Sequence, residues 1–394
     1  MARLIEITGK ALSGEWGTDD ETGEGIPVLR TTNFTNEGVV NYNDVVTRKI
    51  TKKNINDKFL RKGDIIIEKS GGSDKFPVGR VIYFDGVENT YLFNNFTGLL
   101  RVKDREVWYP RYIFYSLYAN YKRGGTRSFE NKTTGLHNLK TDTYVEQFEV
   151  GEKSKKEQVS ICNKLDKLHD VMKLREQELQ MLNDLIKARF VEMFGDPVLN
   201  EKGWKTKPLL DMGKCKNGMN FHYDDSGVEI NCLGVGDFKD LSVIDNTEQL
   251  PTVSLNEMPS EEYLLKDDDI VFVRSNGNKA LVGRSVAVYP GDIPTTFSGF
   301  CIRYRKYDNA VTIPYLLRVL KADSIRKKMA GRGANIQNLN QQILGTLVIP
   351  VPPIELQMEF SDFVKQVDKS KVVVQKALDE TQILFNSLMQ QYFG

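Results

Sequence analysis

The residues of this chain that could do chemistry lie in four polar, glycine-containing loops. Residues 121–132 (YKRGGTRSFENK) and 325–342 (IRKKMAGRGANIQNLNQQ) gather arginine, lysine, asparagine and glutamine. Residues 68–75 (EKSGGSDK) and 273–279 (VRSNGNK) add serine beside basic residues. Arginine and lysine can bind phosphates or guanine edges, while asparagine and glutamine can bind adenine through two hydrogen bonds. The loops therefore predict contacts with DNA, against the plainer interpretation that they are ordinary surface turns.

We predict direct DNA contact for basic, amide and hydroxyl side chains of these loops. In the first half of the chain they are Lys69, Ser70, Lys75, Lys122, Arg123 and Arg127. In the second half they are Arg274, Asn276, Asn278, Lys279, Lys327, Arg332, Asn335 and Gln337.

No catalytic constellation is visible in the sequence. The chain lacks a GxxxxGK[ST] phosphate loop, an HExxH zinc site and an Asn-Pro-Pro-aromatic sequence of the amino-methyltransferase kind. Glu130–Lys132 (ENK) matches the ExK of metal-dependent nucleases, although such a tripeptide is more often a solvated loop. The histidines His137, His169 and His222 have no visible partner. We therefore predict no catalytic residue, no metal ligand and no cofactor on this chain.

Length and composition limit the class of protein. A chain of 394 residues exceeds a comfortable single core, so two domains are expected. The 54 basic and 53 acidic residues nearly cancel, which neither indicates nor excludes a nucleic-acid binder. No stretch approaches the roughly 18 consecutive apolar residues of a membrane span. The four cysteines are scattered, which argues against zinc and against a secreted disulfide scaffold, so we expect a cytoplasmic protein.

One long helical pattern occurs twice in the chain. Residues 155–194 contain no glycine or proline, and steps of four and three along them meet mostly apolar side chains. The same register recurs 199 positions later, up to the C-terminus, so the sequence predicts two long helices of matched length that each need a partner. The predicted seam residues are Leu165, Leu168, Leu179, Leu182, Ile186, Val364, Val367, Val374, Leu378 and Phe385.

The segments that precede the two helices also match. Residues 61–80 and 266–284 both place an acidic residue before a β-branched run, then a basic residue, serine and glycine, and close on Val-Gly-Arg. Residues 93–102 (FNNFTGLLRV) pair with residues 296–305 (TFSGFCIRYR). Short β-branched runs between glycine and asparagine turns predict strands and hairpins. Each half is therefore expected to form the same mixed α/β globule.

Each globule is expected to contain one helix with proline in its opening turn, at residues 109–121 and 313–329. The predicted domains are a first globule at 1–152, a first long helix at 153–197, a second globule at 198–353 and a second long helix at 354–394.

This arrangement resembles the DNA-specificity (S) subunit of type I restriction-modification systems over essentially the whole chain. The resemblance rests on two GDI…SG-like strands at residues 63–71 and 268–277, on FVEMFGDP at 190–197 and on IPVPPIELQMEF at 349–360. It implies an α+β fold with two target-recognition domains, joined by two long helices that form an antiparallel coiled coil with a pseudo-two-fold repeat. The first half departs from the pattern, because EVGEKSKKEQ (149–158) replaces the Pro-Pro before its helix.

The resemblance also implies function and partners. Each domain is expected to read one half of a bipartite, asymmetric target in double-stranded DNA. The expected partners are two DNA methyltransferase (modification) subunits, which would bind S-adenosylmethionine, and restriction motor-nuclease subunits. The chain itself would be non-catalytic. Two alternatives stay open: a metal-dependent nuclease, and a coiled-coil scaffold that does not bind DNA.

Overall fold

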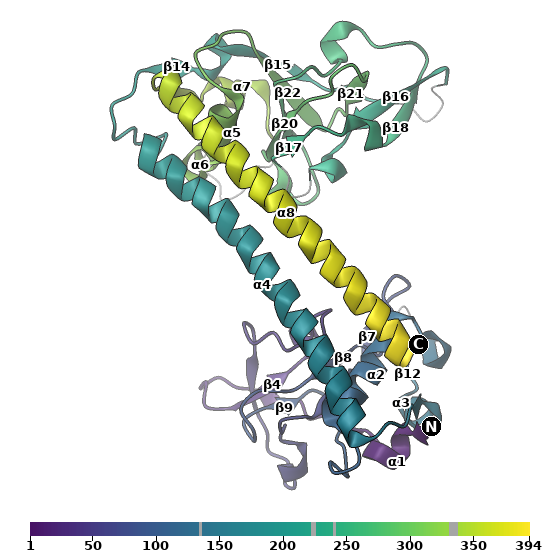
Figure 1. Cartoon of the computed structure of the whole chain (residues 1–394). Helices are drawn as coiled ribbons and strands as arrows, with labels where there is room; N and C mark the ends of the chain where they lie inside the picture. Colours follow the sequence, from purple (N-terminus) through teal and green to yellow (C-terminus); the bar gives the residue numbers. More distant parts are fainter. Residues whose placement is uncertain (134–135, 222–225, 239–241, 331–337) are drawn as a thin grey trace. The chain divides into compact units, whose positions relative to one another are not determined.

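The computed structural model describes residues 1–133, 136–221, 226–238, 242–330 and 338–394. The chain divides into two compact units. The first unit comprises Met1–Glu176 and Lys376–Gly394, and the second comprises Gln177–Gln375. Two 40-residue helices, α4 (Lys155–Phe194) and α8 (Ile354–Phe393), each contribute residues to both units (Figure 1). The prediction of two long helices of matched length is confirmed.

The first unit is a mixed α/β globule. Its strands form sheets in the orders β2-β10-β6-β8, β3-β5-β4-β9 and β11-β12-β7, and β1 pairs with β13. The strands are β1 (Ala2–Arg3), β2 (Leu12–Ser13), β3 (Thr18–Asp19), β4 (Ile26–Leu29), β5 (Val46–Lys49), β6 (Ile65–Glu68), β7 (Ser70–Gly72), β8 (Val81–Tyr83), β9 (Leu92–Phe93), β10 (Thr97–Leu100), β11 (Glu130–Thr133), β12 (Leu136–Leu139) and β13 (Glu149–Val150). The helices are α1 (Leu4–Thr8), α2 (Pro110–Lys122) and α3 (Thr141–Gln147).

Strand β6 lies in the middle of the first unit because both of its faces are apolar. Ile65 and Ile67 pack in one buried cluster with Tyr112 of α2, whereas Ile66 packs in a second cluster with Leu99 of β10. Successive side chains of a strand point to opposite faces, so a continuous β-branched run is buried only where both faces are covered.

The second unit is built in the same way. Its sheets have the orders β15-β22-β19-β20-β17 and β18-β16-β21, and β14 pairs with β23. The strands are β14 (Thr206–Pro208), β15 (Gly213–Asn217), β16 (Val228–Leu233), β17 (Val243–Ile244), β18 (Thr252–Leu255), β19 (Asp269–Val273), β20 (Ser285–Val288), β21 (Thr295–Phe297), β22 (Cys301–Lys306) and β23 (Val348–Pro350). The helices are α5 (Ile313–Lys321), α6 (Asp323–Ala330) and α7 (Gln341–Gly345). Both faces of strand β19 are buried, as in β6: Ile270 and Phe272 pack in one apolar cluster, and Val271 and Val273 pack in another.

A buried ion pair repeats at the start of each central strand. Arg101 donates through Nε and Nη2 to the two oxygens of Asp64 at 2.8 and 2.7 Å. In the second unit Arg305 donates through the same atoms to Asp269, at 2.7 Å each. Both carboxylates are fully buried. The duplication read from the sequence therefore extends to individual hydrogen bonds.

A buried glutamine joins each long helix to its globule. Gln158 of α4 accepts from Tyr109 N at 2.8 Å and donates to Val107 O and Lys153 O. In the second unit Gln357 of α8 accepts from Thr312 N at 2.9 Å and donates to Ala310 O and Pro352 O. Neither glutamine has exposed surface. Each helix is thus fixed in its first turn to the segment that opens α2 or α5.

The two long helices start differently. Ser154 and Glu157 form a capping box before α4, in which Ser154 N donates to Glu157 Oε2 at 2.9 Å and Glu157 N donates to Ser154 Oγ at 3.3 Å. Helix α8 follows Pro352 and Pro353 instead. The departure noted at residues 149–158 is therefore a change of helix-start signal at an equivalent junction.

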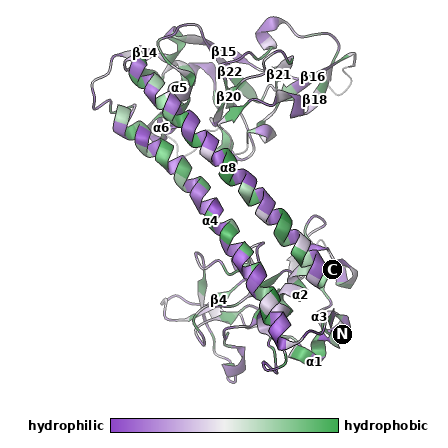
Figure 2. Cartoon of the chain, viewed as in Figure 1, coloured by the Kyte–Doolittle hydropathy of each residue, from purple (hydrophilic) through white to green (hydrophobic). Residues whose placement is uncertain are grey.

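Segments of α4 and α8 pack together in each unit and run in opposite directions there (Figure 1). In the second unit Arg189 pairs with Glu359 at 2.8 Å, and the rings of Phe190 and Phe360 are 5.6 Å apart. Polar and apolar residues alternate around both helices (Figure 2). Predicted seam residues in the apolar cluster of the first unit are Leu165, Leu168, Leu378 and Phe385. Those in the second unit's cluster are Leu182, Ile186, Val364 and Val367, while Leu179 is half-buried and Val374 is buried.

The expectation of one helix at residues 313–329 is wrong. The chain forms two helices, α5 and α6, that are separated by Ala322 in an extended conformation (φ −64°, ψ 139°). Asp323 and Ser324 follow the break, and such residues favour helix starts over helix interiors because their side chains compete for backbone hydrogen bonds.

Candidate nucleic-acid interface

Lys69 and Ser70 lie where β6 ends and β7 begins, beside a cleft of about 430 Å³. The Lys69 ammonium donates to Ser13 Oγ at 3.0 Å, and burial lowers the pKa of Lys69 from its ordinary 10.5. A partly desolvated cation interacts more strongly with an anion than a solvated one, because the local dielectric is lower. Asn95 and Phe96 also line this cleft, so it presents a cation, an amide and an aromatic ring.

Arg274 occupies the equivalent place at the end of β19. Its backbone N donates to Phe300 O at 2.7 Å, as Lys69 N donates to Phe96 O at 2.8 Å in the first unit. Arg274 Nη1 also donates to Gly299 O at 3.3 Å. Both units therefore place a basic residue against a loop that carries a phenylalanine.

Asn276 and Asn278 shape the loop that follows β19. Asn276 Oδ1 accepts from Asn278 N at 2.7 Å, and Asn278 Oδ1 accepts from Ala280 N at 3.1 Å as the N-cap of a short 3₁₀ helix, η8 (Lys279–Leu281). Lys279 is exposed. These contacts give both asparagines a structural role, and their contact with a base stays a prediction.

Lys75 lies on a loop whose backbone is held by Arg127. The Arg127 guanidinium donates to Asp74 O at 3.2 and 3.3 Å and to Lys75 O at 3.4 Å. Lys75 itself is exposed, with its ammonium 5.3 Å from the centre of the Phe76 ring. Arg127 thus stabilises the loop that presents Lys75, and its own contact with DNA stays a prediction.

His137 has partners that the sequence did not show. Its Nδ1 lies 3.0 Å from Glu130 Oε2 and its Nε2 lies 3.6 Å from Asp74 Oδ1, with the side chain only 6% exposed. Glu130 Oε1 also accepts from Val78 N at 2.9 Å. Glu130, the acid of the candidate ExK sequence, therefore stabilises the base of the loop that carries Asp74 and Lys75. Within the described ranges no group of three or more His, Cys, Asp or Glu residues could hold a metal ion.

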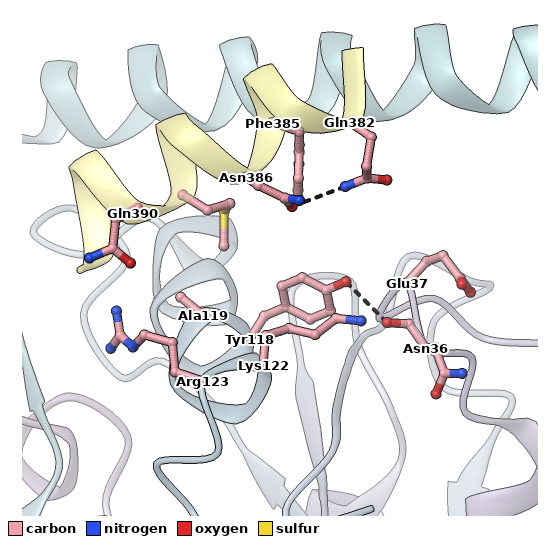
Figure 3. A pocket seen from close by; sticks show the side chains of 11 residues that line it. Asn36, Glu37, Tyr118, Ala119, Lys122, Arg123, Gln382, Phe385, Asn386 and Gln390 are labelled. Carbon is pink, nitrogen blue, oxygen red and sulfur yellow. Dashed lines mark hydrogen bonds between the residues drawn. The ribbon is translucent and has the colours of Figure 1, made fainter. Parts of the chain in front are cut away.

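Lys122 and Arg123 lie at the end of α2 and line a pocket of about 460 Å³ in the first unit (Figure 3). The end of α8 forms another wall of this pocket, with Phe385 among its residues. Arg123 Nη1 donates to Phe393 O, and the Lys122 ammonium lies 5.3 Å from the Tyr118 ring centre. Both cations are exposed, and their contact with DNA stays a prediction.

Lys327 lies in the last turn of α6, on a helix that also carries a partly buried arginine. Burial lowers the pKa of Arg326, and its Nη1 has no hydrogen-bond partner among the described residues. Burial, followed by the charge of Arg318, lowers the pKa of nearby Lys321 to about 8. The second unit therefore concentrates positive charge here. The predicted residues Arg332, Asn335 and Gln337 lie outside the described residues.

Two further candidates for this interface, Phe96 and Phe300, were not predicted from the sequence. Each is exposed in its unit, beside Lys69 or Arg274. The signal was present in the sequence, because both segments contain Phe-x-x-Phe, at Phe93–Phe96 and at Phe297–Phe300.

The fold and these loops define a class of protein: two α/β units of one plan, each with basic and amide side chains on loops beside its central strand. The family described as type I restriction modification DNA specificity domain matches residues 4–184 and 201–381. The chain belongs to this family, and DNA sequence recognition is its function. In the described part of the chain, no helix is long and apolar enough to cross a membrane.

Similar proteins agree with the family. The type I restriction enzyme StySPI specificity subunit of Salmonella potsdam is 26% identical over 387 residues, which is 93% of this chain and 80% of the relative. The putative type I restriction enzyme MjaX specificity subunit of Methanocaldococcus jannaschii is 25% identical over 195 residues, which is 48% of this chain and 45% of the relative.

Solved structures share the fold. The S subunit of a type I restriction-modification system from M. genitalium superposes with a TM-score of 0.56 at 17% identity, covering 100% of this chain and 95% of the other. A structure concerned with complex assembly and conformational transition of the type I R-M system has a TM-score of 0.57 at 15% identity, covering 100% and 96%.

Proposed function

We propose that this chain reads a bipartite, asymmetric DNA target and positions a methyltransferase on it. The proposal rests on one observation: the two units share the same buried central strand and buried ion pair, but the loops that follow their central strands differ in sequence. The Asp64–Arg101 and Asp269–Arg305 pairs are alike in every hydrogen bond described above. The loops that follow are SGGSDKFP (70–77) and SNGNKAL (275–281). Different side chains on one frame favour two half-sites of different sequence.

An exchange of one unit tests this proposal. Residues 1–150 are replaced by those of a relative with a known target, once alone and once together with residues 376–394, which belong to the same unit. The second chimera keeps the contacts between the globule and the end of α8 and controls for misfolding. We expect one half of the methylated sequence to change and the other to stay. Sequencing of methylated adenines across a duplex library measures this, and a change in both halves would refute independent reading.

We further propose that the chain alone is not an enzyme and that S-adenosylmethionine binds the modification subunit. The engagement of Glu130 by Val78 N and His137 supports this over a nuclease, because an ExK carboxylate must be available to a metal ion. We expect the purified chain neither to bind S-adenosylmethionine in equilibrium dialysis nor to cut DNA with Mg²⁺. Cleavage that Glu130→Gln abolishes would establish the nuclease instead.

Exposed apolar side chains on α4 support docking of protein partners, which we propose to be two modification subunits followed by restriction subunits. Val171 and Leu174 are 37% and 63% exposed in the first unit, and Met181 and Leu185 are 62% and 46% exposed in the second. Leu174→Glu and Leu185→Glu should weaken assembly, whereas Gln180→Glu on the same helix should not. Native mass spectrometry measures the stoichiometry, and full assembly of both leucine variants would move the docking surface elsewhere.

A cytoplasmic location fits the same proposal, since all four cysteines are free and the target is DNA.

A further inference from the structure

Two phenylalanines at equivalent places in the two units hold their rings in solvent. Phe96 is 52% exposed and Phe300 is 63% exposed, and neither belongs to the apolar clusters of its unit. A single exposed apolar residue is ordinary on a protein surface. Its recurrence at the same position of two units with different loops indicates that the ring has a use outside the core.

The backbone fixes the position of Phe96. Lys69 N and Ser70 N donate to Phe96 O at 2.8 and 3.3 Å. Thr97 N closes the turn by donating to Asn94 O at 3.1 Å. The ring is therefore presented from a rigid turn that leads into β10, at the edge of the cleft that Lys69 lines.

The same frame holds Phe300 in the second unit. Arg274 N and Ser275 N donate to Phe300 O at 2.7 and 3.3 Å, and Cys301 N closes the turn by donating to Ser298 O at 2.8 Å. The agreement of these distances with those around Phe96 shows that the two rings are presented by the same local structure.

The surroundings of the rings suit a nucleotide. A cation accompanies each ring, Lys69 in the first unit and Arg274 in the second, and exposed Asn95 lies beside Phe96. Asp142 also lines the cleft of the first unit. A cation can bind a phosphate, an amide can bind a base edge, and an aromatic ring can stack on a base face.

The repetition favours a contact that ignores base sequence. Two half-sites of different sequence share the phosphate backbone and the flat faces of stacked bases, but not the base edges. We propose that Phe96 and Phe300 each wedge against a base step of the half-site that their own unit reads, which partly unstacks that step. This inference rests on the proposed function. Apolar side chains inserted at a base step are a known means of bending duplex DNA towards a protein surface.

The test uses the full chain assembled with its modification subunits and duplexes that carry 2-aminopurine at successive positions of each half-site. 2-Aminopurine brightens when it unstacks. We expect bright positions in both half-sites with the wild type, and their loss in one half-site only with Phe96→Ala and in the other only with Phe300→Ala. Each alanine variant should bind about 5- to 150-fold more weakly, the range that corresponds to about 1–3 kcal/mol for one stacked base.

Matched variants distinguish loss of the stacking ring from a general loss of folding. Phe96→Trp should keep the signal, and Val87→Ala, which alters a 67% exposed residue of the same unit, should leave affinity unchanged. The salt dependence of binding should be the same in all variants, because no charge is removed. Specific binding by the wild type with less than a twofold effect of both alanine variants would overturn the inference. So would loss of the modification subunits at unchanged DNA affinity, which would make the rings a protein contact. Absence of specific binding by the wild type would instead refute the proposed function.

Discussion

At the residue scale, Asp64 shows how much one side chain fixes in this protein. It has no exposed surface, it accepts from Nε and Nη2 of Arg101, and its Oδ2 also accepts from Arg61 N at 2.8 Å. The pKa of Arg101 is raised, and its hydrogen bond to Asp64 contributes most to the shift. A buried ion pair stabilises a fold little more than a well-packed apolar pair would. Removal of one partner is costly, however, because the other charge is left buried without compensation.

We therefore expect Asp64→Ala to destabilise the first unit by about 3–5 kcal/mol. Adding Arg101→Leu should recover part of this loss, because no unpaired guanidinium then remains. Urea unfolding followed by circular dichroism measures both variants. A loss below about 1 kcal/mol in the single variant, as for an exposed ion pair, would contradict the structural role assigned here.

A second prediction at this scale concerns Glu68, whose side chain is 6% exposed beside Arg80. Burial raises the pKa of Glu68 above its ordinary 4.5, and Arg80 only partly opposes the shift. Because the folded-state pKa lies above the unfolded one, protonation favours the folded state. The stability that the proton contributes is present below the unfolded pKa and is lost as the pH rises through the folded pKa.

Glu68→Gln should remove this dependence. The free energy of unfolding of the variant should therefore rise relative to that of the wild type as the pH rises above the ordinary glutamate pKa of 4.5. Denaturant unfolding at a series of pH values measures the difference. Glu106→Gln, at an exposed position, is the control for loss of a carboxylate elsewhere in the unit. If the free energy of unfolding of the variant instead fell relative to that of the wild type as the pH rose, the ion pair with Arg80 would outweigh burial in setting the pKa of Glu68.

At the element scale, a buried glutamine helps to hold each long helix to its globule. Gln158 and Gln357 are fully buried, and each makes hydrogen bonds to the backbone on both sides of a helix junction. These bonds satisfy the first backbone N–H or carbonyl groups around α2 and α5, which would otherwise be buried without partners.

We expect Gln158→Leu and Gln357→Leu each to destabilise the unit that contains the residue by about 1–3 kcal/mol, because backbone partners are left unsatisfied. Hydrogen exchange should rise at α2 in the first variant and at α5 in the second. Gln180→Leu, on an exposed turn of α4, is the control and should leave exchange unchanged. Equal effects of all three variants would mean that helix propensity, not the junction, is responsible.

At the scale of the whole molecule, the two units present corresponding lysines on unlike loops. Lys75 and Lys279 are aligned between the repeated segments 61–80 and 266–284, and both are exposed. The loops around them are stabilised differently, by Arg127 in the first unit and by Asn278 in the second. A lysine kept in this position on both loops suits a contact with phosphate, which all sequences share.

Lys75→Ala and Lys279→Ala should therefore weaken specific and non-specific binding alike. Each should lower the slope of log affinity against log salt by about one, and the double variant should lower it by about two. Binding titrations across a salt series measure this, with Lys376→Ala on α8 as a control that should keep the wild-type slope. A change in target sequence at constant slope would show that these lysines read bases instead.

The sequence by itself determined the duplicated architecture, because helical periodicity, the β-branched runs and their common offset are local patterns that packing must respect. It also aligned Lys69 with Arg274 and Phe96 with Phe300, although it gave no reason to single out the phenylalanines. Its apolar spacing predicted one helix across Ala322, although Asp323 and Ser324 carry a local signal for the start of a new helix.

Only the tertiary structure decided which polar side chains are engaged within the protein. It places Glu130 and His137 together under the Lys75 loop, and it turns Arg127 onto the backbone of that loop. It also buries Arg303 where the repeat has Leu99. These outcomes join residues from different strands and loops, so no spacing along the chain encodes them. The physical reason is that burial and hydrogen-bond partners are properties of a position in space, which a linear pattern specifies only where the contacts are local.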